Sequence, residues 1–125
     1  MKYYLGLDMG TTGVKAAVFS PDGVMAGAGL AEYTLDTPSP DIVELETEQY
    51  WTSAKKAIAE AVAKAAIRAE DIQSVAVTGQ AETLIFTDAA GQPVRKAIVW
   101  LDNRAHEEAA ELEKQFTNEA LFRMS

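Results

Sequence analysis

The stretch Gly6–Lys15, GLDMGTTGVK, joins an apolar, β-prone segment to a turn rich in glycine and threonine. Residues 3–7 have the composition of a buried strand, and residues 14–20, VKAAVFS, indicate a second strand. The sequence SPDG then predicts a type I turn. Residues 24–35 continue as a third strand, so we expect an antiparallel meander of three short strands.

Gly27 and Gly29 lie within the third predicted strand. An interior glycine weakens a strand and often marks a bulge or the close approach of another backbone. We therefore expect one of these two features here.

The rest of the chain alternates between predicted helices and strands, which indicates the α/β class. The helix after the first long loop has apolar residues, Tyr50 and Trp51 among them, at helical spacing on one side, and Thr47 is its predicted N-cap. The expected elements are a loop at residues 36–41, a helix from Glu48 to about Ile67, strands at 72–79, 83–88 and 97–100, a helix over about 105–116, and the start of another helix at Thr117.

The composition is that of one globular domain, since 125 residues suffice for a single core and 48% of them are apolar. A formal net charge of −8 argues against nucleic acid and acidic membranes as partners. The absence of cysteine excludes disulfides and thiolate metal sites. No apolar run reaches the length of a membrane span and the start of the chain is not a signal peptide, so a cytoplasmic location is expected.

Two common phosphate-binding motifs are absent from the opening stretch. A P-loop requires G-x-x-x-x-G-K-[ST], whereas Lys15 lies two residues after Gly13 and no hydroxyl residue follows it. The dinucleotide fingerprint G-x-G-x-x-G requires a different glycine spacing. A phosphate site here must therefore be built by the hairpin itself.

The turn of this hairpin has the groups that bind a phosphate. Gly10 and Gly13 permit a positive φ and a close approach of the backbone to a ligand. Successive N–H groups in such a turn form a concavity that binds anions. Thr11 and Thr12 add hydroxyl donors, and Lys15 adds a positive charge. We therefore predict that these five residues bind phosphate.

Asp8 precedes the turn and would repel a phosphate group directly. Mg²⁺ explains a carboxylate in this position, because the ion typically binds one or two carboxylates together with phosphate oxygens and water. Asp8 is therefore the candidate metal ligand. The alternative is a glycine-rich hairpin with a solvated aspartate and no ligand.

Three segments of the chain resemble those of a known family. Residues 6–23 resemble the first phosphate-binding hairpin of the superfamily of sugar kinases, heat-shock chaperones and actins. Residues 40–51, PDIVELETEQYW, and residues 75–105, VAVTGQAETLIFTDAAGQPVRKAIVWLDNRA, are similar to segments of the FGGY carbohydrate kinases, with the G-Q-x-x-x-x-x-x-x-D and W-x-D-x-R signatures. The resemblance implies that residues 1–125 are the N-terminal part of the first, sugar-binding domain of such a kinase.

The resemblance implies an α/β fold of the ribonuclease-H-like kind, in which three antiparallel strands are followed by parallel strands near Ile72 and Thr83. It also implies transfer of the γ-phosphate of ATP, with Mg²⁺, to a hydroxyl of a small sugar or polyol. In this family the catalytic base and the adenosine site lie later in the sequence. Both are expected beyond Ser125, so this chain alone is expected to be inactive. The oligomeric state is left open, with a dimer as one option.

The resemblance also assigns roles to single residues. Asp8 matches the aspartate near Mg²⁺ and the transferred phosphate, and the turn matches the site of the β- and γ-phosphates of ATP. The residues that match the phosphate turn are Gly10, Thr11, Thr12, Gly13 and Lys15, and those that match the substrate side are Gln80, Ala81, Glu82, Trp100, Asp102 and Arg104.

The chemistry of the substrate-side residues suits a sugar. A carboxylate such as Glu82 or Asp102 accepts hydrogen bonds from two hydroxyls at once, and the Trp100 indole offers an apolar wall to the C–H face of the ring. The alternatives are that Trp100 is a core residue and that Asp102 caps a helix beginning near Asn103. His106, the single histidine, is expected on a solvated helix face and is given no role.

The sequence leaves the substrate open. The pair Glu82-Thr83 is similar to glycerol kinases, which have arginine where this chain has Ala81, whereas WLDNR is more similar to gluconate and pentulose kinases. A carboxylate at position 82 favours a neutral ketose, such as xylulose, or a polyol over a sugar acid. The alternative function is a non-catalytic domain of the same fold that binds phosphate or sugar weakly, or associates with a partner.

Overall fold

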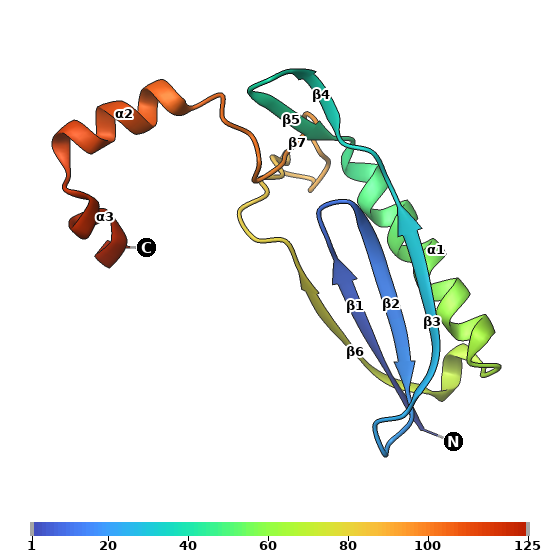
Figure 1. The fold of residues 1–125 in the computed structure, drawn as a ribbon. Coiled ribbons are helices and arrows are strands. Elements are labelled where there is room, and N and C mark those ends of the chain that lie inside the picture. The colour runs from blue at the N-terminus through green and yellow to red at the C-terminus, as the bar shows by residue number, and fades with distance from the viewer. Residues whose placement is uncertain (1, 125) are drawn as a thin grey trace.

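The computed structural model describes residues 2–124, and its main sheet has four strands. These are β1 (Tyr3–Met9), β2 (Gly13–Phe19), β3 (Met25–Glu32) and β6 (Ile72–Gly79), in the order β3-β2-β1-β6 (Figure 1). β1 and β3 both pair antiparallel with β2, and β6 pairs parallel with β1. The sheet thus has the three antiparallel strands of the predicted meander and, on the other side of β1, a parallel strand.

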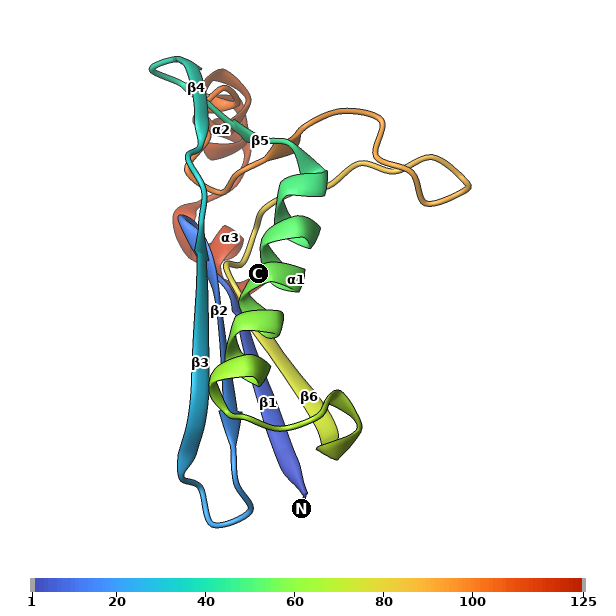
Figure 2. The ribbon, with the colours of Figure 1, turned by 90° about the vertical axis from the view of Figure 1, so that its right-hand side faces the viewer.

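Helix α1 (Thr47–Lys64) covers one face of this sheet, across β3, β2 and β1 (Figure 2). Its buried residues are mostly alanines, which let the helix approach the strands closely. A Cβ atom added to Gly29 would lie 2.1 Å from the carbonyl oxygen of Ala57, and one added to Gly27 would lie 2.4 Å from that of Ala61. The two glycines therefore mark close packing, which is one of the two predicted explanations.

Both ends of α1 differ from the prediction. Thr47 is not the N-cap, because the helix begins at Thr47 itself and the preceding residue, Glu46, makes no side-chain capping hydrogen bond. The buried hydroxyl of Thr47 has no hydrogen-bond partner among the described residues. The helix ends at Lys64, before the predicted end, because Ala66 takes a left-handed conformation with φ of 52° and turns the chain away.

The two aromatic residues in the first turns of α1 have different surroundings. Tyr50 is buried, as its spacing predicts, whereas Trp51 is 60% exposed. The ammonium group of Lys55 lies 5.4 Å from the centroid of the Trp51 ring, within the range of a cation–π contact. Trp51 is therefore a surface residue rather than part of the predicted apolar stripe.

A second, smaller sheet contains β4 (Asp36–Ser39), β5 (Ile42–Leu45) and β7 (Ala97–Ile98), in the order β4-β5-β7 with antiparallel pairing. The predicted loop at residues 36–41 is thus wrong for most of its length. The prolines of this segment are tolerated because β4 is an edge strand. No strand pairs with its outer side, so a residue without an N–H group costs no hydrogen bond there.

The predicted strand at residues 83–88 is wrong. This segment makes isolated bridges only, Leu84 with Ile98 and Thr87 with Pro93, and forms an irregular hairpin that leads into β7. Its apolar side chains are largely exposed, because the hairpin projects from the main sheet instead of joining it (Figure 2). Within residues 2–124, β6 is therefore the one parallel strand of the main sheet.

The last described elements are α2 (His106–Gln115) and α3 (Asn118–Met124), which extend away from the main sheet (Figure 1). Neither helix has a buried residue, and His106 is exposed as predicted. A short 3-10 turn, Ala69–Asp71, leads into β6. No helix in the described part of the chain is long and apolar enough to span a membrane.

Candidate functional site

The turn between β1 and β2 is closed by a hydrogen bond from the Gly10 N–H to the Gly13 carbonyl, with an N–O distance of 3.0 Å. Neither glycine has a positive φ, so that part of the prediction is wrong. The glycines are needed for space, because a Cβ atom on Gly10 would lie 2.9 Å from the Gly13 carbonyl oxygen. The N–H groups of Thr11 and Thr12 have no acceptor among the described residues, which leaves two backbone donors for a ligand.

Asp8 and Lys15 lie opposite each other on β1 and β2, so their side chains share one face of the sheet. The adjacent residues Leu7 and Val14 are buried in the core against α1, so Asp8 and Lys15 are on the face that α1 leaves open. Neither side chain makes an ion pair with another described residue. A hollow of about 670 Å³ runs over this face and is lined by both of them and by Thr78. Two opposite charges without protein partners thus stand beside the turn.

The substrate-side segment begins where β6 ends. The N–H of Gln80 donates to the carbonyl of Met9 at 3.0 Å, which holds this segment beside the end of β1. Glu82 is exposed and has a φ of 64°, in the left-handed region. Ala81 is exposed as well, and the Glu82 carboxylate makes no hydrogen bond or ion pair with another residue in the range 2–124.

Trp100 joins the two predicted halves of the site. Its indole Nε1–H donates to the hydroxyl of Thr11 at 2.9 Å, and its backbone N–H donates to the hydroxyl of Thr83 at 3.3 Å. The side chain is 49% exposed, so the alternative of a core tryptophan is wrong. The phosphate turn and the substrate-side segment, which are about 90 residues apart in the sequence, therefore meet at one indole ring.

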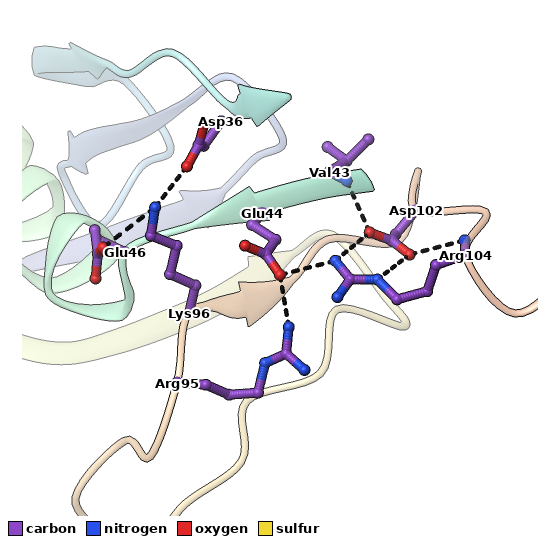
Figure 3. Close-up of polar contacts among 8 residues, drawn as sticks. All are labelled: Asp36, Val43, Glu44, Glu46, Arg95, Lys96, Asp102 and Arg104. Carbon is purple, nitrogen blue, oxygen red and sulfur yellow. Dashed lines mark hydrogen bonds and ion pairs between the residues drawn. The ribbon is translucent and has the colours of Figure 1, made fainter. Parts of the chain in front are cut away.

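Asp102 and Arg104 hold each other and the second sheet, as Figure 3 shows. One Asp102 carboxylate oxygen accepts hydrogen bonds from Nε of Arg104 at 2.8 Å, and the other accepts from the backbone N–H of Val43 at 2.7 Å. Arg104 also pairs with Glu44 at 2.8 Å. The Asp102 side chain is only 3% exposed. It caps no helix, because α2 begins four residues later.

The electrostatics of this cluster are strongly coupled. The Arg104 guanidinium, more than the backbone N–H groups of Val43 and Arg104, holds the pKa of Asp102 well below its usual range despite burial. The hydrogen bond from Arg104 also lowers the pKa of Glu44, and the two carboxylates raise the pKa of Arg104. All three groups are therefore charged over the physiological pH range. This arrangement fixes the segment that follows Trp100.

Sequence reasoning missed several residues of this region. Glu44 also pairs with Arg95 at 2.5 Å, while Lys96 pairs with Asp36 at 2.5 Å, so the second sheet is bound to the segment before β7 (Figure 3). The sequence signal is the alternation of apolar and charged residues in Val43-Glu44-Leu45-Glu46, which is typical of a strand with one polar face. The prolines that precede this segment favour a loop instead.

A magnesium site would need Asp8. No group of three or more His, Cys, Asp or Glu residues within residues 2–124 could hold a metal ion by itself. Mg²⁺ commonly binds through one or two carboxylates plus phosphate oxygens and water. A single unpaired carboxylate beside free N–H donors fits that mode of binding, and it does not fit a metal cage made by the protein alone.

The profile of the FGGY family of carbohydrate kinases, N-terminal domain, matches residues 3–125. The chain belongs to this family. The resemblance predicted from the sequence is therefore confirmed.

This member of the FGGY family is similar to named glycerol kinases and to solved structures of sugar kinases. A glycerol kinase from Trichlorobacter lovleyi is 40% identical over 124 residues, which are 98% of this chain and 25% of the relative. The crystal structure of a xyloylose kinase from Brucella ovis matches with a TM-score of 0.85 and 32% identity, over 90% of this chain and 24% of that one. A gluconate kinase structure from Lactobacillus acidophilus has a TM-score of 0.88 at 20% identity, over 98% of this chain and 24% of that one, which shows the shared fold alone. The chain spans about a quarter of the length of these relatives.

Proposed function

We propose that this chain supplies the phosphate-binding turn and one wall of the sugar pocket of an ATP-dependent carbohydrate kinase. The reaction is transfer of the γ-phosphate of ATP to a hydroxyl of a small sugar or polyol. The observation that carries the proposal is the hydrogen bond from the Trp100 indole to the Thr11 hydroxyl, at 2.9 Å. It brings a candidate sugar-binding ring into contact with the turn that has free N–H donors, as phosphoryl transfer between bound substrates requires.

The turn binds the phosphates in this proposal. The free N–H groups of Thr11 and Thr12 and the unpaired ammonium group of Lys15 supply donors and positive charge without displacing any contact within the described chain. Asp8 would hold Mg²⁺ together with phosphate oxygens, and the ion would neutralise charge on the transferred group. Gly10 and Gly13 keep the backbone free of side chains at the point of approach.

The substrate side favours a neutral polyol or ketose. The exposed Glu82 carboxylate is free to accept hydrogen bonds from hydroxyls, and the half-exposed Trp100 ring offers an apolar surface. Asp102 and Arg104 take a supporting role in this proposal, because their charged groups are already paired with each other and with Glu44. They hold the segment that carries Trp100 rather than the sugar.

The turn can be tested on the 125-residue chain labelled with ¹⁵N and titrated with pyrophosphate, with and without Mg²⁺. We expect the amide signals of Thr11 and Thr12 and the indole signal of Trp100 to shift, and Mg²⁺ to tighten binding. In Asp8→Asn the tightening by Mg²⁺ should disappear, because an amide is a poor ligand for this ion. Asp22→Asn, in the distant turn after β2, is the matched control.

Shifts confined to other parts of the chain, or a full effect of Mg²⁺ in Asp8→Asn, would contradict the proposal. In a protein of the relatives' full length that begins with this chain, Asp8→Asn should lower kcat by about 100-fold or more, since electrostatic placement carries most of phosphoryl transfer.

A further inference from the structure

Tyr33 lies directly behind the phosphate turn, just after the end of β3. Its backbone N–H donates to the carbonyl of Thr12 at 3.1 Å, and its hydroxyl donates to the carbonyl of Gly10. One residue thus holds two of the turn's carbonyl groups on the side that faces the protein. Nothing in the pattern of the sequence marked Tyr33 as part of the site.

The bond to Gly10 determines where the next N–H points. In a trans peptide unit the C=O and N–H bonds point in opposite directions, because the unit is planar. The Gly10 carbonyl and the Thr11 N–H belong to the same unit. A hydroxyl that holds this carbonyl inward therefore directs the Thr11 N–H outward, and this N–H is one of the two without an acceptor among the described residues.

The Tyr33 ring is itself fixed by the substrate-side segment. Tyr33 packs edge-on against Tyr50, with ring centroids 5.6 Å apart and an interplanar angle of 85°. The hydroxyl of Tyr50 accepts a hydrogen bond from Nε2 of Gln80 at 3.0 Å. The contacts from Gln80 through Tyr50 and Tyr33 to Gly10 thus form a partly buried connection between the two halves of the site.

The Tyr33 hydroxyl stays protonated at physiological pH, so it is a permanent donor. Burial, followed by the nearby Tyr50 and Asp8, raises the pKa of Tyr33 to about 12. Burial also raises the pKa of Tyr50. Neither ring hydroxyl ionises in the range where a kinase works, and the Gly10 carbonyl keeps its partner throughout that range.

We propose that Tyr33 is a positioning residue of the phosphate turn, which holds the Gly10 carbonyl so that the Thr11 N–H is aimed at the bound phosphate. This inference rests on the proposed function of the turn. Tyr33 touches neither phosphate nor sugar in this arrangement, and it acts through the backbone of the turn.

Tyr33→Phe isolates the hydroxyl, because the ring and its packing on Tyr50 are kept. In the ¹⁵N-labelled chain, the residual dipolar coupling of the Thr11 N–H reports the orientation of that bond. We expect this coupling to be averaged toward zero in Tyr33→Phe, with the couplings of β1 and β2 unchanged. Pyrophosphate affinity in the presence of Mg²⁺ should fall about tenfold, as is typical when a supporting partner is lost. Tyr4→Phe, at a tyrosine that is 43% exposed on β1, is the matched control.

An unchanged Thr11 coupling in Tyr33→Phe would overturn the positioning role whatever the affinity does. A changed coupling with unchanged affinity would overturn its relevance to phosphate. If the unaltered chain binds no pyrophosphate, the proposed function fails, while the coupling still decides whether Tyr33 orients the turn. Should Tyr33→Phe not fold, Tyr50→Phe provides a second measure, since it releases the aromatic pair from Gln80. A Thr11 coupling that shifts toward zero in Tyr50→Phe, relative to the unaltered chain, supports the role, and an unchanged coupling overturns it.

Discussion

Glu82 and Ala66 are the non-glycine residues with a positive φ in the described part of the chain. Ala66 follows the end of α1, where left-handed residues commonly stop a helix. Glu82 belongs to no helix or strand, and the left-handed conformation costs such a residue about 1–2 kcal/mol. Backbone strain of this kind collects at ligand sites. The conformation therefore supports Glu82 as a residue that is held out toward a ligand.

Glu82→Gln tests which substrate the site accepts. We expect it to lower kcat/KM for the best neutral polyol or ketose by about 10- to 100-fold, because hydrogen bonds to a charged group are lost. The same change should reduce discrimination against gluconate, since two carboxylates 4 Å apart repel by roughly 4 kcal/mol at an effective dielectric constant near 20. The measurement is steady-state kinetics of a protein of the relatives' full length, with Glu108→Gln on exposed α2 as control. An unchanged kcat/KM would remove Glu82 from the specificity.

Asp102→Asn should reveal the acid sensitivity of the cluster. The folded pKa of Asp102 is depressed, mainly by Arg104, so its contribution to stability is complete above the unfolded value of about 3.9 and is lost as the pH falls below it. We expect Asp102→Asn to lower the free energy of unfolding by about 1–2 kcal/mol at pH 7. The difference from the unaltered chain should shrink as the pH falls from about 5 toward 2.

Urea titrations monitored by circular dichroism at several pH values give this difference directly. The exposed Asp41, two residues before Val43, provides the control Asp41→Asn. A difference that stays constant between pH 5 and pH 2 would show that the Asp102 charge does not support the folded state.

Helix α1 packs closely on β3 at Gly29. Gly29→Ala should lower the free energy of unfolding by about 3 kcal/mol, because its Cβ would lie 2.1 Å from the Ala57 carbonyl and helix and strand must separate. Gly6→Ala is the matched control, since the nearest atom to its Cβ is a ring carbon of Phe19 at 3.9 Å. Equal stability of the two variants would contradict the proposed close packing.

The elements that the sequence predicted well are those whose signals are local. The hairpin of β1 and β2 follows from an apolar strand that breaks at Gly10, and α1 follows from apolar residues at helical spacing. The segment at residues 83–88 has the composition of a strand, but composition does not say whether a partner strand is available. In the structure its partners are Ile98 and Pro93, in an irregular hairpin outside the main sheet.

The candidate site was predictable where it depends on residue type and not where it depends on contacts between distant segments. The donors of the turn and the carboxylate of Asp8 were visible in one short stretch. From the sequence, Tyr33 is simply part of the third predicted strand. Its role depends on the hydrogen bond from its hydroxyl to the Gly10 carbonyl, which the sequence does not reveal. Arg104 looked like a ligand for a sugar, and its pairing with Glu44, 60 residues away, could not be inferred from spacing.

The chain spans about one quarter of the length of the relatives. Helix α1 packs on β3, β2 and β1 but hardly on β6, so Val75 and Val77, which pair with Leu5 and Leu7, are exposed. The catalytic base and the adenosine site that the family resemblance implies are assigned to no residue of this chain. We therefore expect the isolated chain to bind phosphate at the turn and to catalyse no transfer.

A coupled assay of ADP release tests the proposed kinase activity. The enzyme is a protein of the relatives' full length whose first 125 residues are this chain, and the acceptors are glycerol, ketopentoses and gluconate. We expect ADP release that depends on a neutral polyol or ketose, and no release by the 125-residue chain alone. Absence of acceptor-dependent release with every compound, or release by the isolated chain, would contradict it.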